Sequence, residues 1–333
     1  MDCRVFKLKA LTHIWTGDGN RQGMRLITTG LLGSIRWWFE VLVRGLGGKV
    51  CDPTMKEVRC PAANKSPHEP GHHCVVCELF GCTGWARKFG FKVLNENGQP
   101  KQAQIKADET FILRFTEIRP ICEEEWCLLD LTLRLIAEYG AIGGKTVFKP
   151  SDEPNRQNVF HHRDFGLIDI VKASPDIHCV EEKLRAYVMD GKWRTDFDDR
   201  DFSWASLANF WCVKGRYLSR QDSNHSSFNR VIGRQEPKNR GQQLRAGATE
   251  FDRWLAGRQQ ESKKVFSFKE PLEARRTFGF VNPHLRDSNQ KPLDFNQMRQ
   301  RLKQVWPDFQ DSELLEGQAI LQSLLSSSSG GTP

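Results

Sequence analysis

The sequence lacks any long apolar run, since no stretch approaches the roughly 18 consecutive apolar residues that mark a membrane-spanning helix. Its first residues, MDCRVFKLKA, also lack the apolar core of a signal peptide. We therefore expect a cytoplasmic protein with no membrane partner. In that reducing compartment the ten cysteines are expected to be thiols or metal ligands rather than a disulfide framework.

A complete nucleotide-binding P-loop is also missing. The stretch YGAIGGKT, residues 139–146, ends in Gly-Lys-Thr, but four residues must separate the first glycine of a P-loop from that ending. Tyr139 occupies the place of this glycine, and the preceding residues have a helical pattern, whereas a P-loop follows a strand. An ATP site of this kind is excluded. The sequence likewise shows no repeat period and no recognisable Ser-His-Asp or Cys-His nucleophile.

The composition favours a folded protein with an anionic partner. Its 333 residues suggest two domains, and 38% hydrophobic residues, with 21 Phe and 10 Trp, suffice for a sizeable core. The formal charge of +8 and the pI near 9.0 favour nucleic acid as a partner without proving it.

The first half has the periodicity of a split βαβ unit. Residues 4–12 alternate as a strand with Phe6, Leu8 and Ala10 on the core face, and a helix is expected from Thr28 or Thr29 to about Gly45. A hairpin around Asn97-Gly98 and a second helix over residues 122–140 follow. The last strand is expected near residues 146–148.

The second half is less regular. We expect a strand at residues 167–173 and helices near residues 181–191, 203–213 and 251–257, with a late strand over residues 275–282. Between them lies a long, polar, Arg- and Asn-rich segment over residues 219–250.

A Cys- and His-rich insertion over residues 51–82 is the clearest candidate metal site. Cys74 and Cys77 form a C-x2-C pair, and Cys60 lies fourteen residues before Cys74. Because structural Zn²⁺ takes four sulfur or imidazole ligands, the best set is Cys60, His68, Cys74 and Cys77. The fourth ligand stays open among His68, His72, His73 and Cys51. The alternative is a solvated loop with free thiols.

The first helix presents Trp37 away from its apolar face, close to Glu40 and Arg44, while Arg36 lies at the edge of that face and Trp38 in the core. A tryptophan beside arginines suits stacking on a base or ribose next to a phosphate. The alternative is that Trp37 packs against another domain or subunit.

Two further groups are weaker candidates for catalytic residues. Asp196, Asp198, Asp199 and Asp201 have the chemistry to bind Mg²⁺ for phosphodiester cleavage, but a solvated loop is favoured because basic residues are mixed among them. His161 and His162 are a potential acid–base pair, with surface residues again the favoured interpretation.

The glycine-rich loop, with Gly143, Gly144, Lys145 and Lys149, is suited to present amide groups and positive charge to phosphates.

Several of these stretches together resemble one family. TGLLGSIRWWFEVL, residues 29–42, is similar to the Gly-x-x-Arg-Trp-Trp signature of the RAMP proteins, the repeat-associated subunits of CRISPR effector complexes. LTHIWTGDG, CELFGCTGW and GAIGGKTVFKP resemble, in order, the family's first strand, its Leu-Phe-Gly region and its glycine-rich loop. Within the family, the chain is most similar to the first subunit of the type III-B (Cmr) complex over about residues 4–150.

The resemblance implies an α+β protein made of tandem ferredoxin-like (RRM-like) domains, and the Cys/His-rich insertion adds a zinc knuckle to the first of them. The domains would span residues 1–150 and 151–325, followed by a flexible tail over residues 326–333. It implies a non-catalytic subunit that binds guide RNA and, through it, target RNA, beside other type III effector subunits. The RNA-binding residues would be Arg25, Arg36, Trp37, Arg44, Gly143, Gly144, Lys145 and Lys149. A RAMP-type endoribonuclease, metal-dependent or metal-free, and a structural adaptor are the alternatives.

Overall fold

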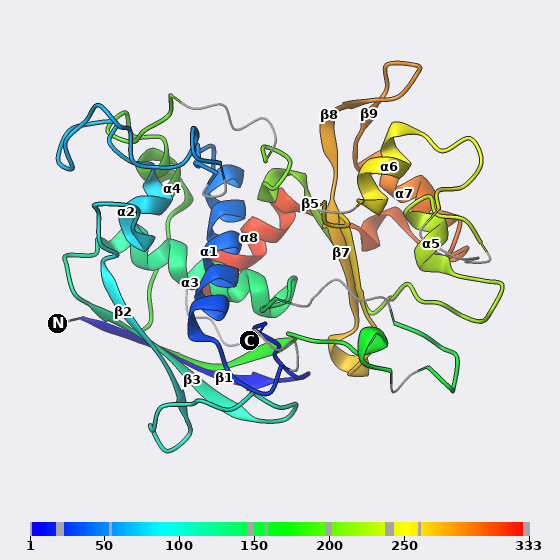
Figure 1. Ribbon diagram of the computed structural model, residues 1–333, viewed down its shortest axis with the longest axis horizontal. Coiled ribbons are helices and arrows are strands. Elements are labelled where there is room, and N and C mark those ends of the chain that lie inside the picture. The colour runs from blue at the N-terminus through cyan, green and yellow to red at the C-terminus, as the bar shows by residue number, and fades with distance from the viewer. Residues whose placement is uncertain are drawn as a thin grey trace.

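Two antiparallel sheets with helices packed against them make up the protein (Figure 1). The computed structural model describes residues 2–17, 23–52, 55–144, 150–156, 159–196, 202–236, 243–258 and 261–328. Among these residues, no helix combines the length and the apolar character needed to cross a lipid bilayer.

The first sheet has the strand order β2-β3-β1-β4. Its strands are β1 (Cys3–Ala10), β2 (Phe89–Asn95), β3 (Thr110–Glu117) and β4 (Ile168–Ser174). The helices of this half are α1 (Thr28–Gly45), α2 (Val75–Phe80), α3 (Glu123–Glu138) and α4 (Glu181–Val188). The predicted order of strand, helix, hairpin and helix is therefore confirmed.

Alternation along β1 fixes which face of this sheet is buried. Phe6, Leu8 and Ala10 are fully buried, as predicted, while the intervening residues are half-exposed. Across the ladder Phe6 pairs with Leu113 and Leu8 with Phe111, so apolar side chains from both strands meet on the same face. Helices α1 and α3 cover that face (Figure 1).

The fourth strand of the first sheet comes later in the chain than predicted. The expected strand at residues 146–148 lies outside the described residues, and β4 pairs with β1 instead. The strand predicted at residues 167–173 corresponds to β4, but its pairing with β1 was not predicted. The first sheet therefore takes a strand from beyond residue 150, where the sequence suggests that the second domain begins.

The second sheet has the strand order β10-β5-β7-β6. Its strands are β5 (Phe210–Lys214), β6 (Val265–Phe268), β7 (Arg276–Phe280) and β10 (Leu315–Glu316), and β8 (Asn282–Arg286) pairs with β9 (Pro292–Leu293) in a separate hairpin. The helices are α5 (Ser227–Val231), α6 (Glu250–Ala256), α7 (Phe295–Lys303) and α8 (Gly317–Ser328). Short 3₁₀ turns occur at Phe160–His162, Leu207–Asn209, Leu272–Ala274 and Asp311–Glu313.

Strand β5 is buried on both faces. Phe210 and Cys212 face the core shared with the first sheet, whereas Trp211 and Val213 face a second core under α5, α6 and α7. The helix predicted over residues 203–213 is therefore wrong. The reason is that a strand covered on both sides is apolar throughout and has no alternation to separate it from a buried helix.

Three smaller features also differ from the predictions. Cys127 in α3 and Cys179 before α4 form a disulfide, because these two segments pack together, so the expectation of only thiols and metal ligands is wrong for this pair. The polar segment 219–250 contains α5 and the start of α6. Helix α8 continues to Ser328, and residues 329–333 lie outside the described residues.

The two halves meet closely at the turn Leu207–Asn209. A Cβ atom placed on Gly317, the first residue of α8, would lie 1.6 Å from the carbonyl oxygen of Leu207. At the end of α1, a Cβ atom on Gly45 would lie 2.4 Å from the Cβ atom of Leu207. The absence of side chains at both glycines lets α1 and α8 pack on the same turn.

We expect Gly317→Ala to lower the free energy of unfolding by about 1–3 kcal/mol, because the added methyl group overlaps backbone that has no room to move. Gly191→Ala is the matched control, since no heavy atom lies within 4 Å of its added Cβ atom. Urea denaturation monitored by circular dichroism compares the two. Equal stability of both variants would contradict this close contact.

Candidate functional site

An aromatic cavity of about 330 Å³ lies between α1, the glycine-rich segment and the second sheet. We call it the aromatic cavity because six aromatic residues contribute to its wall. It is lined by Gly30, Ser34, Trp37, Trp38, Ala141, Gly143, Gly144, Phe202, Trp204, Ser262, Phe266 and Phe278. Trp37 and the pair Gly143–Gly144, which were predicted to bind RNA, are more than 100 residues apart in the sequence and line the same cavity.

Helix α1 places its two adjacent tryptophans differently. The indole N–H of Trp38 donates to the carbonyl of Ala141 at 2.9 Å, and its ring is 2% exposed, as predicted for a core residue. The half-buried ring of Trp37 contacts the edge of Phe280 in β7, with 5.8 Å between ring centres. Trp37 therefore packs against the second half of the protein and also borders the cavity.

The glycine-rich segment is fixed by hydrogen bonds within the protein. The amide of Gly143 donates to Ser34 Oγ at 3.0 Å, and that of Gly144 donates to the carbonyl of Trp15 at 2.8 Å. Gly143 has a φ of +104°, and a Cβ atom there would lie 2.6 Å from the Trp15 oxygen, so only glycine fits. Both amides already have acceptors and are not free to bind a phosphate.

A buried lysine lies behind the cavity wall. Lys264 Nζ is 4.9 Å from the ring centre of Trp204 and 5.2 Å from that of Trp254, and it donates to the carbonyl of Ser262 at 2.7 Å. Burial lowers the pKa of Lys264 to about 8, with Glu261 opposing the change. Its ammonium group is still mostly protonated at pH 7 and strengthens the positive potential beside the aromatic rings.

A cluster of four cysteines lies beside α1, next to Arg36. The thiols of Cys51, Cys60, Cys74 and Cys77 all lie within 4.8 Å of one another, and none is more than 4% exposed. The Cys51 sulfur is 3.6 Å from that of Cys77 and 3.7 Å from that of Cys74. Tetrahedral zinc with Zn–S bonds of 2.3 Å separates its sulfurs by about 3.8 Å, so the spacing fits such an ion.

The fourth position of this cluster is taken by Cys51 rather than by His68. His68 is exposed, and its ring lies 5.7 Å from that of Trp85. His72 and His73 hydrogen-bond to each other, and His73 also contacts Glu78 at 2.6 Å. The three histidines that the sequence offers for this position therefore lie outside the thiol group.

Arg36 belongs to the surroundings of the cysteine cluster. Its guanidinium donates to Cys77 Sγ at 3.3 Å, to Glu40 at 3.0 Å and to the carbonyl of Gly81 at 3.2 Å. Its side chain is 21% exposed. Consecutive residues Arg36 and Trp37 thus serve two separate sites, one at the cysteines and one at the aromatic cavity.

The other predicted residues lie elsewhere. Arg25 is exposed in the loop before α1, and Arg44 donates to the carbonyl of Ala205 at 3.2 Å. Lys145 and Lys149 lie outside the described residues, as do Asp198, Asp199 and Asp201. Asp196 pairs with Arg194 at 2.7 Å. His161 is exposed, whereas His162 is buried at 7% exposure beside a different cavity.

Sequence reasoning did not identify the far wall of the aromatic cavity. Phe202, Trp204, Phe266 and Phe278 come from the second half, which has no recognised motif. The available signal was the density of aromatic residues over residues 202–211 and 266–280. Which of these rings faces a cavity depends on long-range strand pairing.

The comparisons with known proteins are consistent with the motifs. The sequence model of the RAMP superfamily matches residues 7–148. Cmr1 from Pyrococcus furiosus, in its apo form, aligns over 98% of this chain and 97% of its own, with 11% identity and a TM-score of 0.42. A chain of the Csm3-Csm4 subcomplex of the type III-A CRISPR-Cas interference complex aligns over 56% of this chain and 93% of its own, with 12% identity and a TM-score of 0.26.

No curated protein sequence matches this one significantly. The family assignment therefore rests on the sequence-model match, whose limits enclose the Arg-Trp-Trp signature, the cysteine cluster and Gly143–Gly144. Residues 7–148 are similar to the RAMP superfamily, and the rest of the chain lies outside this match.

Proposed function

We propose that this protein is an RNA-binding subunit of a type III CRISPR effector complex, of the Cmr kind, and that the aromatic cavity receives bases of the guide RNA. The observation that carries this proposal is the convergence of Trp37, Gly143 and Gly144 on one aromatic wall. In the sequence, Trp37 and the Gly143–Gly144 pair belong to two separate motifs, a polar-face tryptophan and a glycine-rich loop.

The cavity suits an unpaired base better than a duplex. Aromatic side chains stack on any base, so they bind single strands with little sequence preference. Trp37 and Trp204 offer such faces, and the charge of Lys264 lies behind Trp204. We assign the phosphate contacts to Lys145 and Lys149 and to exposed Arg25, since the amides of Gly143 and Gly144 are already bonded.

The chemistry of the cavity supports a binding role rather than RNA cleavage. Among the described residues that line it, none is an acid or a histidine, so the wall provides no general acid or base. Asp196, the described member of the acidic cluster, is neutralised by Arg194. Sequence recognition would then be left to pairing between the guide and its target RNA.

We propose that the two halves are tandem ferredoxin-like domains. If the strands of each sheet are numbered 1 to 4 in chain order, both sheets have the same spatial order, 4-1-3-2. In the first sheet this is β4-β1-β3-β2, and in the second it is β10-β5-β7-β6. In this division β4 belongs to the first domain, and the second begins near the turn Leu207–Asn209. Other effector subunits would contact the surfaces that this pair of domains leaves exposed.

We further propose that Cys51, Cys60, Cys74 and Cys77 hold a structural Zn²⁺ ion. The four buried thiols satisfy tetrahedral coordination, which leaves no open position for catalysis. Four thiolates and Zn²⁺ carry a net charge of about −2, and Arg36 would offset part of it through its contact with Cys77. The ion would hold the insertion together beside α1, which contacts the cluster through Arg36.

We expect Trp37→Ala to weaken binding of single-stranded RNA by about 5- to 150-fold, because one stacked base contributes about 1–3 kcal/mol. The dependence of affinity on salt should be unchanged, since no charge is removed, whereas Lys145→Ala should reduce the salt slope by about 1. Fluorescence anisotropy over a series of salt concentrations measures both quantities.

Trp126→Ala is the control for this experiment. Trp126 is also a half-buried helical tryptophan, but it does not line the aromatic cavity. Its loss should affect stability without affecting RNA affinity. Equal RNA affinity of wild type and Trp37→Ala would overturn the assignment of the cavity.

For the metal, we expect purified protein to contain about one zinc ion per chain, and Cys51→Ser to lose it because only three thiolates remain. His68→Ala is the matched control and should keep its zinc. Elemental analysis by mass spectrometry gives the metal content, and thermal unfolding with and without a chelator gives its effect on stability. Zinc retained by Cys51→Ser but lost from His68→Ala would contradict the proposed ligand set.

A further inference from the structure

A second cavity has a volume of about 400 Å³. We call it the polar cavity. Its walls come from residues 11–13, Ala107, residues 150–151, residues 162–165 and residues 269–271, so it also bridges the two halves of the protein. Its volume falls in the range of about 300–1,000 Å³ that is usual for small-ligand sites.

The first polar group in this cavity is a histidine whose tautomer is fixed. The amide of Ala107 donates to His13 Nδ1 at 2.8 Å, so this nitrogen carries no hydrogen. Burial, together with the charges of Arg163 and Lys106, lowers the pKa of His13. Both effects favour the neutral ring, and because Nδ1 accepts the Ala107 hydrogen bond, the hydrogen of that ring lies on Nε2, which is the donor.

The second polar group is a carboxyl group fixed by backbone. Asp164 Oδ2 accepts hydrogen bonds from the amides of Lys269 and Glu270, both at 2.8 Å. Oδ1 receives no hydrogen bond from the described residues and remains available as an acceptor. Burial raises the pKa of Asp164 to about 7, against the two amides, which lower it.

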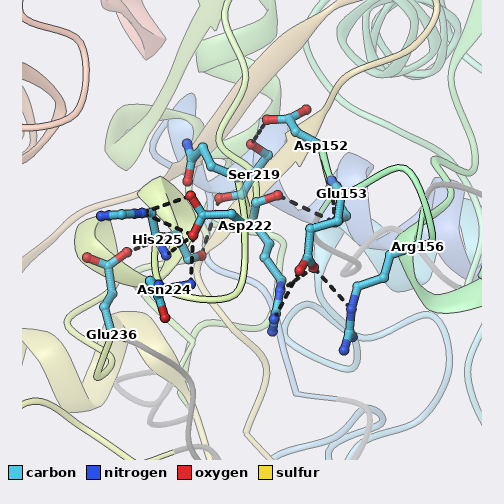
Figure 2. A network of polar contacts seen from close by, with 12 residues as sticks. Asp152, Glu153, Arg156, Ser219, Asp222, Asn224, His225 and Glu236 are labelled. Atoms are coloured by element: carbon cyan, nitrogen blue, oxygen red, sulfur yellow. Dashed lines mark hydrogen bonds and ion pairs between the residues drawn. The ribbon is translucent and has the colours of Figure 1, made fainter.

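Neighbouring hydrogen bonds hold one wall of the cavity in place. Figure 2 shows Asp152, next to the lining residue Ser151, held by Ser219, and Glu153 held by arginines. Lys269 Nζ pairs with Asp152 at 2.8 Å and joins this network to the opposite wall. The polar groups therefore face a preformed site, not a loop that must first order itself.

The structure assigns to the polar cavity one unpaired nucleobase of the bound RNA, held through its Watson–Crick edge by His13 and Asp164. Every base presents a hydrogen-bond donor beside an acceptor on that edge, which matches the acceptor Oδ1 and the donor Nε2–H. The surrounding Leu11, Pro150, Phe165 and Pro271 provide apolar contacts for the ring faces.

The position of the cavity favours RNA over a free small molecule. His13 lies in its wall, and Trp15, two residues further on, accepts the hydrogen bond of Gly144, which lines the aromatic cavity. Two residues of extended chain span about 7 Å, so the two cavities lie close enough for one strand to enter both. The inference therefore rests on the proposed RNA-binding function and adds a second base site to it.

Two substitutions test this site without removing its internal hydrogen bonds. In Asp164→Asn the amide oxygen still accepts from Lys269 and Glu270, but a donor replaces the Oδ1 acceptor. In His13→Asn the side-chain oxygen still accepts from Ala107, and the Nε2–H donor is lost. Thermal melting monitored by circular dichroism verifies that both variants are folded.

The probe is a mixed-sequence single-stranded RNA oligonucleotide in which one position at a time is made abasic. Anisotropy is measured at about pH 8, where Asp164 is mostly ionised. With wild-type protein, removal of the base at one position should weaken binding by about 5- to 30-fold. Asp164→Asn and His13→Asn should each weaken binding of the intact RNA and reduce or abolish the effect of that abasic position.

Failure of this inference is distinguishable from failure of the proposed function. If wild-type protein binds no RNA, the proposed function fails. If it binds RNA in a Trp37-dependent manner, but neither variant changes the effect of any abasic position, only the polar cavity assignment is overturned. Asp164-dependent binding of free nucleosides, with no position-specific effect in RNA, would also overturn it.

Discussion

The contact of Trp38 with Ala141 and the second sheet is the interaction on which the site depends. Its indole donates to the Ala141 carbonyl, and its ring meets Phe210 and Phe278 at centre distances of 5.6 and 5.8 Å. A Cβ atom on Gly140 would lie 2.6 Å from the same ring. One buried tryptophan thus joins α1, the glycine-rich segment and the second sheet, and the aromatic cavity is the space left beside this junction.

This arrangement explains why the adjacent signature residues do different things. Successive residues of a helix point in different directions around its axis, so Arg36 contacts the cysteines and Trp38 contacts the core. Trp37 lies at the boundary between the two halves. The cysteine cluster and the aromatic cavity are therefore linked by rigid helix. The phosphate-binding role that the sequence suggests for Arg36 stays a prediction, and its observed contacts favour support of the cysteine cluster.

Local patterns predicted the first half well, because β1, the hairpin and both helices carry clear periods and turn residues. They did not predict that β4 pairs with β1, or that residues 210–214 form a strand buried on both faces, since both facts depend on long-range pairing. Three of the clustered cysteines were recognisable from spacing. Cys51 was only one of several candidates for the fourth ligand, because its distance from the other three thiols depends on how the whole insertion folds back on α1.

The proposed function places RNA in the aromatic cavity between the two halves. Ultraviolet crosslinking of the intact protein to single-stranded RNA, followed by mass spectrometry of the adducts, tests it most directly, because aromatic side chains stacked on bases crosslink efficiently. We expect adducts on the peptides that carry Trp37 and Trp204, which both line this cavity. Adducts confined to peptides away from this cavity, such as those of the exposed strand β4, would contradict the account.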